Sequence, residues 1–237
     1  MKVEQLLILQ ILAHLLTDYT FQTEKRAKDK NIKGFKSKFL KWHVLLAFSF
    51  SWILSFQLSF IYGSIVIALT HWLLDGLKIH LNRSRNFGKY SYFIDQSIHL
   101  LIIISIVFLY NQFFIQKPLI NLENTKLIAI TTIFILCSKP TNIFIKEIFH
   151  VFDIRIKNNG NNNSDLPNAG KLIGIIERWL VLIFIILNQF EAIGFLIAAK
   201  SLLRFKDNEA LKTEYVLIGT MLSFAIAIVS GIIINLV

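Results

Sequence analysis

The sequence predicts an all-α fold, a polytopic bundle of about eight transmembrane helices, and three observations support this prediction. Hydrophobic residues make up 54% of the 237 residues and include 21 phenylalanines, whereas charged residues make up 17%. Apolar runs near the length of about 20 residues that crosses a bilayer recur along the chain. Basic residues are concentrated between these runs, as in the cytoplasmic loops of membrane proteins.

Eight apolar segments are the predicted spans. They cover residues 3–22, 42–61, 63–80, 92–115, 122–138, 171–189, 191–204 and 214–236. The seventh segment has only 14 residues, so we expect it to be tilted, re-entrant or completed by side chains that reach the interface. The first segment is too long for a cleavable signal peptide and is preceded by too little positive charge.

Between the fifth and sixth spans the pattern changes from a continuous apolar run to a one-sided helix. Pro140 ends the fifth span. Phe144, Ile148 and Phe152 then share one face, which predicts an amphipathic helix lying in the cytoplasmic interface. A segment rich in Asn and Gly follows and predicts a flexible linker. The chain therefore divides into three parts: 1–118, which holds two helix pairs at 3–61 and 63–115, then 119–169, and finally 170–237.

The basic segments predict how the chain is oriented. Residues 23–41 hold eight Lys and Arg against two acids, Glu24 and Asp29. With eight spans, every strongly basic segment falls on one side, so we expect that side to be cytoplasmic and both termini to lie outside. This predicts a multi-pass membrane protein in contact with lipids. The net charge of +10 then requires no nucleic acid partner, and segment 23–41 is suited to anionic lipid or a protein partner.

Seven histidine and aspartate residues lie inside the predicted spans, where ionisable side chains are costly. Four spans place them at a similar depth, within about two turns of the cytoplasmic ends. They are His14 and Asp18, His43, His71 and Asp75, and Asp95 and His99. One His–Asp pair would be typical of structural hydrogen bonding between helices, but three pairs at matched depth favour a functional site.

The spacing of these residues indicates metal binding. In each of the three pairs, the histidine and the aspartate are four residues apart, so both side chains lie on one helix face. Imidazole and carboxylate are ligands that divalent metal ions accept, and zinc is the ion we expect. The cluster is large enough for one ion with supporting carboxylates or for two ions. The only cysteine, Cys137, excludes a cysteine-based zinc site.

The two helix pairs of the N-terminal part also show a faint internal repeat. His14 and His43 are 29 residues apart, and His71 and His99 are 28 residues apart. In both pairs an aspartate follows the first histidine by four residues. If the pairs are copies of one unit, we expect His14 and His71 to lie on opposite sides of one cavity.

The C-terminal part carries its own charged residues near the cytoplasmic ends of its spans. Glu177 is placed to form an interhelical ion pair with Lys200 or Arg204. We favour this structural role because both signs of charge are present. In the alternative, a cationic site binds a phosphate or a lipid headgroup. Its residues would be Arg178, Lys200 and Arg204.

Four motifs carry a resemblance to a known family. They are AHLLTDYTFQT, KWHVLLAF, THWLLDGLK and FIDQSIHLL, and they cover roughly residues 5–115. They resemble the bacterial domain of unknown function 3307, a family of small polytopic membrane proteins, and the C-terminal segments resemble an extension that many members carry. The resemblance implies a membrane fold, a location in the bacterial inner membrane and no established activity. A looser likeness is to membrane-bound metal-dependent hydrolases, although the chain lacks a paired-histidine motif such as H-E-x-x-H.

Three functions are compatible with these residues, and the first is favoured. It is a cytoplasm-facing, metal-dependent hydrolase of membrane-associated phosphoesters or amides. An ion or proton transporter would use the same residues, although these lie near one face rather than at the midplane. A non-enzymatic anchor or sensor would act through segment 23–41. In the hydrolase, His14, His71 and His99 would hold the metal, Asp18, Asp75 and Asp95 would be ligands or the general base, and His43 would be a further ligand or the acid.

Overall fold

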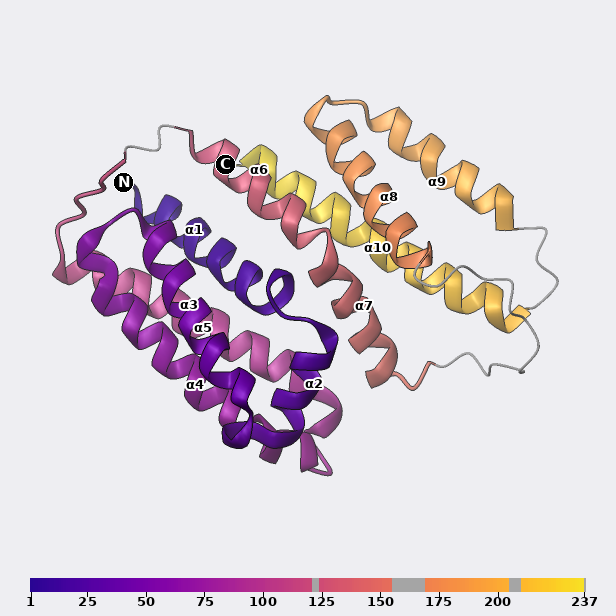
Figure 1. Ribbon diagram of the computed structural model, residues 1–237. Coiled ribbons are helices and arrows are strands. Elements are labelled where there is room, and N and C mark those ends of the chain that lie inside the picture. Colours follow the sequence, from indigo (N-terminus) through magenta and orange to yellow (C-terminus); the bar gives the residue numbers. More distant parts are fainter. Residues whose placement is uncertain (121–123, 155–168, 205–209, 237) are drawn as a thin grey trace. The chain divides into compact units, whose positions relative to one another are not determined.

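The computed structural model describes residues 1–120, 124–154, 169–204 and 210–236, and its secondary structure in these ranges is entirely helical (Figure 1). The chain forms two compact units, Met1–Thr132 and Ile133–Val237. The sequence instead pointed to three parts, with boundaries after residues 118 and 169. Most of the linker expected before the sixth span lies outside the described residues.

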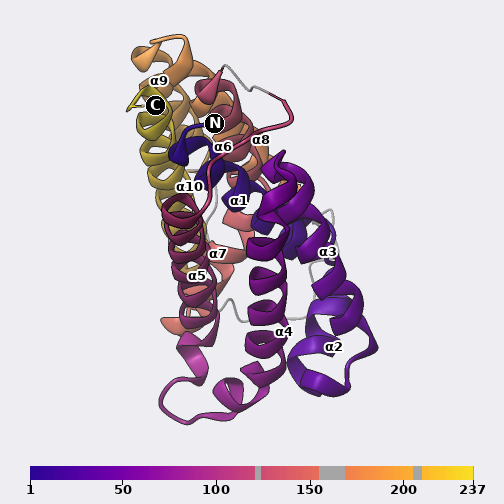
Figure 2. The ribbon, with the colours of Figure 1, turned by 90° about the vertical axis from the view of Figure 1, so that its left-hand side faces the viewer.

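In the first unit, α1, α3, α4 and α5 form a four-helix bundle. The α-helices of this unit are α1 (Val3–Leu15), α2 (Glu24–Lys33), α3 (Lys38–Ser55), α4 (Ile61–Arg83), α5 (Ser91–Phe113) and the first residues of α6 (Thr125–Leu136). Helices α3 and α5 each contact both α1 and α4, as Figure 2 allows the reader to follow. A buried apolar cluster lies toward the end of the bundle at which the chain starts. It consists of Leu6, Phe60, Ile67, Val107 and Tyr110.

Short elements of other helix types connect and end the bundle helices. A π-helical turn, Leu16–Thr20, continues α1. Helix α3 ends where Phe56 adopts a positive φ of 50°, and a 3₁₀ turn, Leu58–Phe60, leads directly into α4. Further 3₁₀ turns lie at Gly34–Lys36 and Gly88–Tyr90. These breaks make the first two predicted spans discontinuous.

The basic segment 23–41 is folded, whereas the sequence predicted a loop. Thr23 caps α2, because its hydroxyl accepts a hydrogen bond from the Arg26 N–H at 3.4 Å. Gly34 then ends the helix with φ +52°, a conformation that glycine adopts without strain. A Cβ atom at this position would lie 2.7 Å from the carbonyl oxygen of Gly76 on α4. Glycine therefore allows the segment to dock closely on α4.

The second unit contains three long helices and the bent continuation of α6. Its helices are α7 (Lys139–Val151), α8 (Ala169–Ile186), α9 (Phe190–Arg204) and α10 (Ala210–Leu236). Helix α10 packs along α8 and also contacts α7. The core of this unit lies between α8, α9 and α10. Its buried residues are Val181, Ile185, Ile193, Phe224 and Ala227.

Three segments of the described chain are long and apolar enough to cross a membrane. They are Leu58–Arg83, Gly88–Phe113 and Glu214–Leu236. Helices α6 and α7 would add a fourth if this pair, bent by 46°, forms one broken span. The predicted break at Pro140 is confirmed, since α6 ends at Leu136 and α7 begins at Lys139. The interfacial position of α7 stays a prediction.

Eight separate spans are therefore not supported, and the reasons are local. Helix α1 has only 13 residues and α9 only 15, so neither reaches the length of about 20 that a straight span needs. Helix α8 has 18 residues, but Lys171, Glu177 and Arg178 are among them. Helix α3 includes two lysines, a histidine and three serines. The apolar runs in the sequence were thus longer than the uninterrupted apolar helices.

Candidate metal centre

The seven predicted histidine and aspartate residues come together in the interior of the first unit. Helix α1 with its π-turn, α3, α4 and α5 all contribute. Apart from Asp18, each residue is at most 5% exposed, and the Asp18 side chain is 8% exposed. The residues are His14, Asp18, His43, His71, Asp75, Asp95 and His99. The structure thus gathers the complete predicted set in one buried cluster.

In each of the three His–Asp pairs, the two side chains approach each other, as the i, i+4 spacing predicted. The distances between imidazole nitrogen and carboxylate oxygen are 4.0 Å for His14–Asp18, 4.0 Å for His71–Asp75 and 3.8 Å for His99–Asp95. Asp18 lies in the π-helical turn, a wider helix that occurs frequently at functional sites. The i, i+4 spacing therefore presents one imidazole and one carboxylate together on each of α1, α4 and α5.

Contacts between helices join the three pairs. His43 Nε2 on α3 lies 3.3 Å from Asp18 Oδ1 and 3.1 Å from Asp75 Oδ2. The ring centroids of His71 and His99 are 4.2 Å apart, and that of His14 is 5.4 Å from His71 and 5.5 Å from His99. His14 and His71, the matching positions of the proposed repeat, therefore lie side by side.

Two lysines, Lys30 buried and Lys78 half-buried, complete the cluster, and the sequence reasoning did not identify either as a site residue. Lys30 of α2 is 3% exposed, and its Nζ lies 2.7 Å from Asp75 Oδ2. Lys78 of α4 places its Nζ 2.7 Å from Asp95 Oδ2. Lys78 follows Asp75 by three residues, so its position on the same helix face was a signal in the sequence. Lys30 had no such signal, because only the docking of α2 brings it inside.

The fold of α2 explains how Lys30 is positioned. Ser37, just after the Gly34–Lys36 turn, donates a hydrogen bond from its hydroxyl to Asp29 Oδ2 at 2.7 Å. Asp29 also forms an ion pair with Lys33. The hydrogen bonds from Lys33 and then Ser37 lower the pKa of the Asp29 carboxyl group below its ordinary value. These contacts hold the end of α2 on the exposed side and leave Lys30 directed toward Asp75.

Gln96, next to Asp95 on α5, links the carboxylates of two helices. Its Nε2 donates to Asp18 Oδ2 and Asp95 Oδ2, at 3.2 Å in both cases. Its Oε1 accepts from the hydroxyl of Tyr19 at 2.9 Å and lies 3.1 Å from His14 Nε2. Gln96 was not predicted as a site residue. Its contacts orient the Asp18 carboxylate and the His14 ring, through Nε2.

Several polar atoms of the cluster are buried without a hydrogen-bond partner among the described residues. They are His14 Nδ1, His43 Nδ1, His71 Nδ1 and His99 Nε2; Asp18 Oδ1 and His43 Nε2, although 3.3 Å apart, also lack a well-aligned hydrogen bond. Buried polar atoms in folded proteins are nearly always paired, so this concentration of unpaired atoms in one place is unusual. All of them are nitrogen or carboxylate oxygen, the donor types that zinc accepts.

Among the described residues, three groups of side chains each have ligand atoms close enough together to bind one metal ion. They are His14–Asp18–His71, His43–His71–Asp75 and Asp75–Asp95–His99, and within each group the ligand atoms lie within 4.8 Å of one another. Ligands of a tetrahedral zinc ion lie about 3.4 Å apart, so side-chain shifts of roughly 1 Å would suffice. Among these carboxylates, Asp75 and Asp95 are held by lysines, whereas the contacts of Asp18 are to Gln96 and to histidines.

A line of buried polar residues continues from the cluster toward the other end of the bundle. On α3 the buried face carries His43, Ala47, Ser51 and Ser55, each one turn further. The Ser51 hydroxyl donates to Gln10 Oε1 at 2.7 Å and lies 3.0 Å from Ser64 Oγ. In return, Gln10 Nε2 donates to the Ser51 carbonyl at 3.0 Å. We call Gln10, Ser51, Ser55, Gln57 and Ser64 the polar seam; each is at most 2% exposed.

A small cavity lies between the polar seam and the cluster. It has a volume of about 10 Å³, and its lining includes Gln10, Ser51, His14 and His71. A cavity of this size and polarity corresponds to about one water molecule. The cluster is thus connected to the seam through a space that polar groups line on both sides.

Comparison with known families settles the relationship that the motifs indicated. The model of a family described as "Protein of unknown function (DUF3307)" matches residues 6–139. The chain belongs to the DUF3307 family. The matched region contains all seven clustered His and Asp residues, both lysines and Gln96. Neither the curated proteins nor the solved structures contain a match to the chain.

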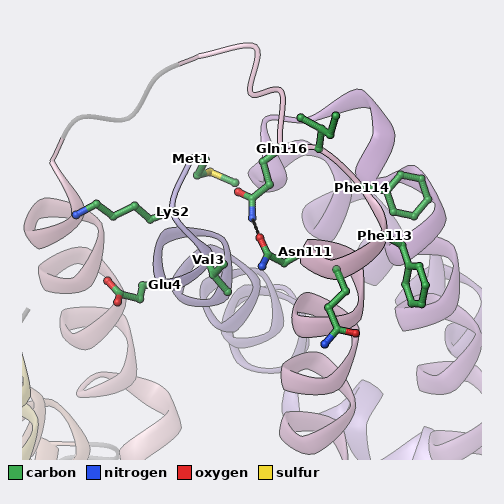
Figure 3. Close-up of a pocket in the computed structure, with 10 residues that line it drawn as sticks. Met1, Lys2, Val3, Glu4, Asn111, Phe113, Phe114 and Gln116 are labelled. Carbon is green, nitrogen blue, oxygen red and sulfur yellow. Dashed lines mark hydrogen bonds between the residues drawn. The ribbon is translucent and has the colours of Figure 1, made fainter.

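A second hollow of the DUF3307 protein lies at the opposite end of α1. Its volume is about 640 Å³, and Met1 to Glu4 and Asn111 to Gln116 line it (Figure 3). Gln116 Nε2 donates to Asn111 Oδ1 at 2.7 Å across its rim. Ten residues of α1, or about 15 Å, separate Glu4 from His14. This hollow is therefore separate from the cluster.

Arg178 lies outside the region that the family model matches, and its buried guanidinium group donates hydrogen bonds to four acceptors. The residue is 1% exposed. Its Nε donates to the Cys137 carbonyl at 2.6 Å and its Nη1 to Ser223 Oγ at 2.9 Å. Its Nη2 donates to the Ser138 carbonyl at 3.2 Å and to Asn142 Oδ1 at 2.7 Å. The guanidinium group thus binds the carbonyl groups at the break between α6 and α7.

The other members of the predicted cationic site are placed differently. Lys200 forms an ion pair with Glu177, the interhelical pair that the sequence favoured. Its Nζ also lies 5.7 Å from the centre of the Phe224 ring. The side chain of Arg204 lies outside the described part of the chain. A phosphate or lipid site formed by Arg178, Lys200 and Arg204 stays a prediction.

Proposed function

We propose that this DUF3307 protein is a membrane-embedded, metal-dependent hydrolase of membrane-associated phosphoesters or amides. The proposal rests chiefly on one group, His14–Asp18–His71: a buried ring nitrogen of each histidine has no hydrogen-bond partner among the described residues, and Asp18 Oδ1 has no well-aligned hydrogen bond. An ion at this point would satisfy three groups whose burial is otherwise costly. His99, whose Nε2 is also unpaired among the described residues, packs against the rings of both histidines and is a candidate further ligand.

The residues around this group supply the remaining chemistry. A bound divalent ion, with zinc as our first choice, lowers the pKa of water and polarises the bond under attack. The oxygen of water forms a bond to phosphorus or to the carbonyl carbon, and the ester or amide bond breaks. A carboxylate of the cluster accepts the proton of the water. His43 gives a proton to the leaving oxygen or nitrogen, because Asp18 and Asp75 on either side stabilise its protonated form.

The location of the site follows the distribution of charge. The cluster lies at the end of the bundle where the basic helix α2 docks on α4, because Lys30 of α2 reaches Asp75. We propose that this end faces the cytoplasm and that the protein is a multi-pass protein of the bacterial inner membrane. In this arrangement, the helices too short to span alone would be completed by neighbouring segments, as Leu16–Thr20 extends α1.

The metal content of the purified protein tests this proposal. The full chain is purified in detergent without chelators, and Zn, Mn, Fe and Ni are quantified. We expect about one ion per chain in the wild type and its loss in His71→Ala and Asp18→Ala. His80→Ala is the matched control, because His80 is exposed on the same helix as His71 and lies outside the cluster. A wild-type protein without stoichiometric metal overturns the proposal.

A second candidate function is translocation of protons or cations, and the polar seam favours it. Helix α3 alone carries buried polar or small residues from His43 to Ser55, about 18 Å along its axis. That is a large part of the hydrocarbon thickness of about 30 Å. The test is potential-driven proton uptake into liposomes containing the protein. Uptake that Ser51→Ala abolishes and the exposed-face control Ser49→Ala retains would favour this candidate over the hydrolase.

A further inference from the structure

The two lysines of the cluster give it a charge balance that depends on the metal. The cluster holds three carboxylates and two ammonium groups: Lys30 is paired with Asp75 and Lys78 with Asp95, whereas Asp18 contacts His43. With neutral imidazoles these five groups leave a formal charge of −1, and a divalent ion would change it to +1. A buried site with a net positive charge attracts an anionic group, whereas a neutral amide gains nothing from it.

The lysines also occupy the place where such a group would meet the site. They come from two different elements, α2 and the last third of α4, and both approach the carboxylates from the basic end of the bundle. Asp75 Oδ2 is shared between Lys30 Nζ at 2.7 Å and His43 Nε2 at 3.1 Å. The bond to a carboxylate uses one of the three ammonium hydrogens of each lysine. The other two are donors of the kind that bind phosphate.

The surroundings of Lys30 match an anionic substrate at a membrane surface. Lys25, Arg26, Lys28, Lys33, Lys36 and Lys38 are all exposed on the same segment. Ile32 and Phe35 of this segment are also exposed, at 58% and 45%. Exposed cations with interspersed apolar side chains are typical of surfaces that bind anionic lipid headgroups. Anions would therefore be concentrated beside the two lysines.

We propose that Lys30 and Lys78 bind the phosphate group of the substrate, so that the substrate is a phosphoester and not an amide. This inference rests on the proposed metal-dependent hydrolase. The chemistry recognised is a phosphate carrying negative charge, either on a lipid headgroup or on a soluble ester. Lys33 provides a matched comparison, because it lies on the same helix as Lys30 but is exposed and paired with Asp29.

Phosphate binding to the metal-loaded full chain tests the inference. Radiolabelled inorganic phosphate is titrated by equilibrium dialysis, with the metal content of every variant measured in parallel. We expect binding to wild type and Lys33→Met with equal affinity, and binding about tenfold or more weaker in Lys30→Met and Lys78→Met. Lys78→Arg keeps the charge and should retain most of the affinity. If Lys30→Met does not fold, Lys78→Met and Lys78→Arg still decide the outcome.

The possible results separate this inference from the function on which it rests. Protein that binds no metal overturns both. Metal-loaded protein that binds no phosphate, or binds it equally well in Lys78→Met, overturns this inference alone. Competition by phosphatidic acid but not by phosphatidylcholine in mixed micelles identifies a lipid phosphate. Binding of inorganic phosphate that neither lipid reduces identifies a soluble ester.

Discussion

Lys30 Nζ lies 2.7 Å from Asp75 Oδ2 in the interior of the first unit, although 45 positions separate the two residues in the chain. This contact is the point at which the basic segment and the four-helix bundle become one structure. It sets the charge of the candidate site and also holds α2 on α4. Its loss should therefore affect both stability and ligand binding.

Removing Lys30 should be costly because it leaves a buried carboxylate without its closest cation. We expect Lys30→Met to lower the free energy of unfolding by about 3–5 kcal/mol. Unfolding by SDS in mixed micelles, followed by circular dichroism, measures this change. The exposed control Lys33→Met should stay within about 0.5 kcal/mol of wild type. Combining Lys30→Met with Asp75→Asn should recover part of the loss, and the absence of any recovery would contradict a direct pair.

Gly34 is required for the docking of α2. Its φ of +52° and the 2.7 Å that would separate a Cβ atom from the Gly76 carbonyl oxygen leave no room for a side chain. We expect Gly34→Ala to destabilise the protein by about 1–3 kcal/mol and to speed tryptic cleavage of α2. Gly194→Ala is the control, since no atom lies within 4 Å of a Cβ there and alanine favours the helix. Unchanged cleavage of Gly34→Ala would show that α2 does not depend on this contact.

The site was predictable from the sequence to the extent that its geometry is local. The three His–Asp pairs follow from the i, i+4 spacing, and each closes to 4.0 Å or less. His43 could be assigned by its depth alone. Lys78 was equally accessible, as it shares a face of α4 with Asp75, but a lysine near a helix end is ordinarily assigned to the interface.

The remainder depends on contacts between distant segments. Helix α2 is highly charged and has no apolar periodicity, so its helix and the burial of Lys30 arise from docking on α4. The predicted number of eight spans is not supported for a related reason. Hydropathy does not register the π-turn after α1 or the left-handed Phe56 that ends α3, and both shorten an apolar run that reads as continuous.

The hydroxyl of Ser51 should contribute more to the free energy of unfolding than that of Ser49. Ser51 contacts Gln10 and Ser64 in the polar seam, whereas Ser49 is bonded only to the Leu45 carbonyl of its own helix. We expect Ser51→Ala to cost about 1–3 kcal/mol of unfolding free energy, because the Gln10 amide oxygen loses its partner inside the bundle. The same SDS titration measures it, with Ser49→Ala as the reference. Equal stabilities of the two variants would contradict a structural contribution of the seam.

Arg178 should hold the break between α6 and α7 in place. Pro140 has no N–H for the Leu136 carbonyl, and the hydroxyl of Thr141 donates to that carbonyl instead, at 2.7 Å. The next two carbonyls, of Cys137 and Ser138, accept from the Arg178 guanidinium group. A lysine keeps the charge but cannot reproduce this fork of donors. We therefore expect Arg178→Lys to lose at least about 2 kcal/mol of unfolding free energy.

The single cysteine of the chain reports directly on this break. Cys137 is fully buried, so wild-type protein should react slowly with N-ethylmaleimide. In Arg178→Lys the end of α6 loses its donors, and the rate of Cys137 modification should rise severalfold because local opening exposes the thiol. Lys146→Met, at an exposed position of α7, should react like wild type. A slow rate in Arg178→Lys, together with wild-type stability, would show that Pro140 and Thr141 are sufficient to fix the bend.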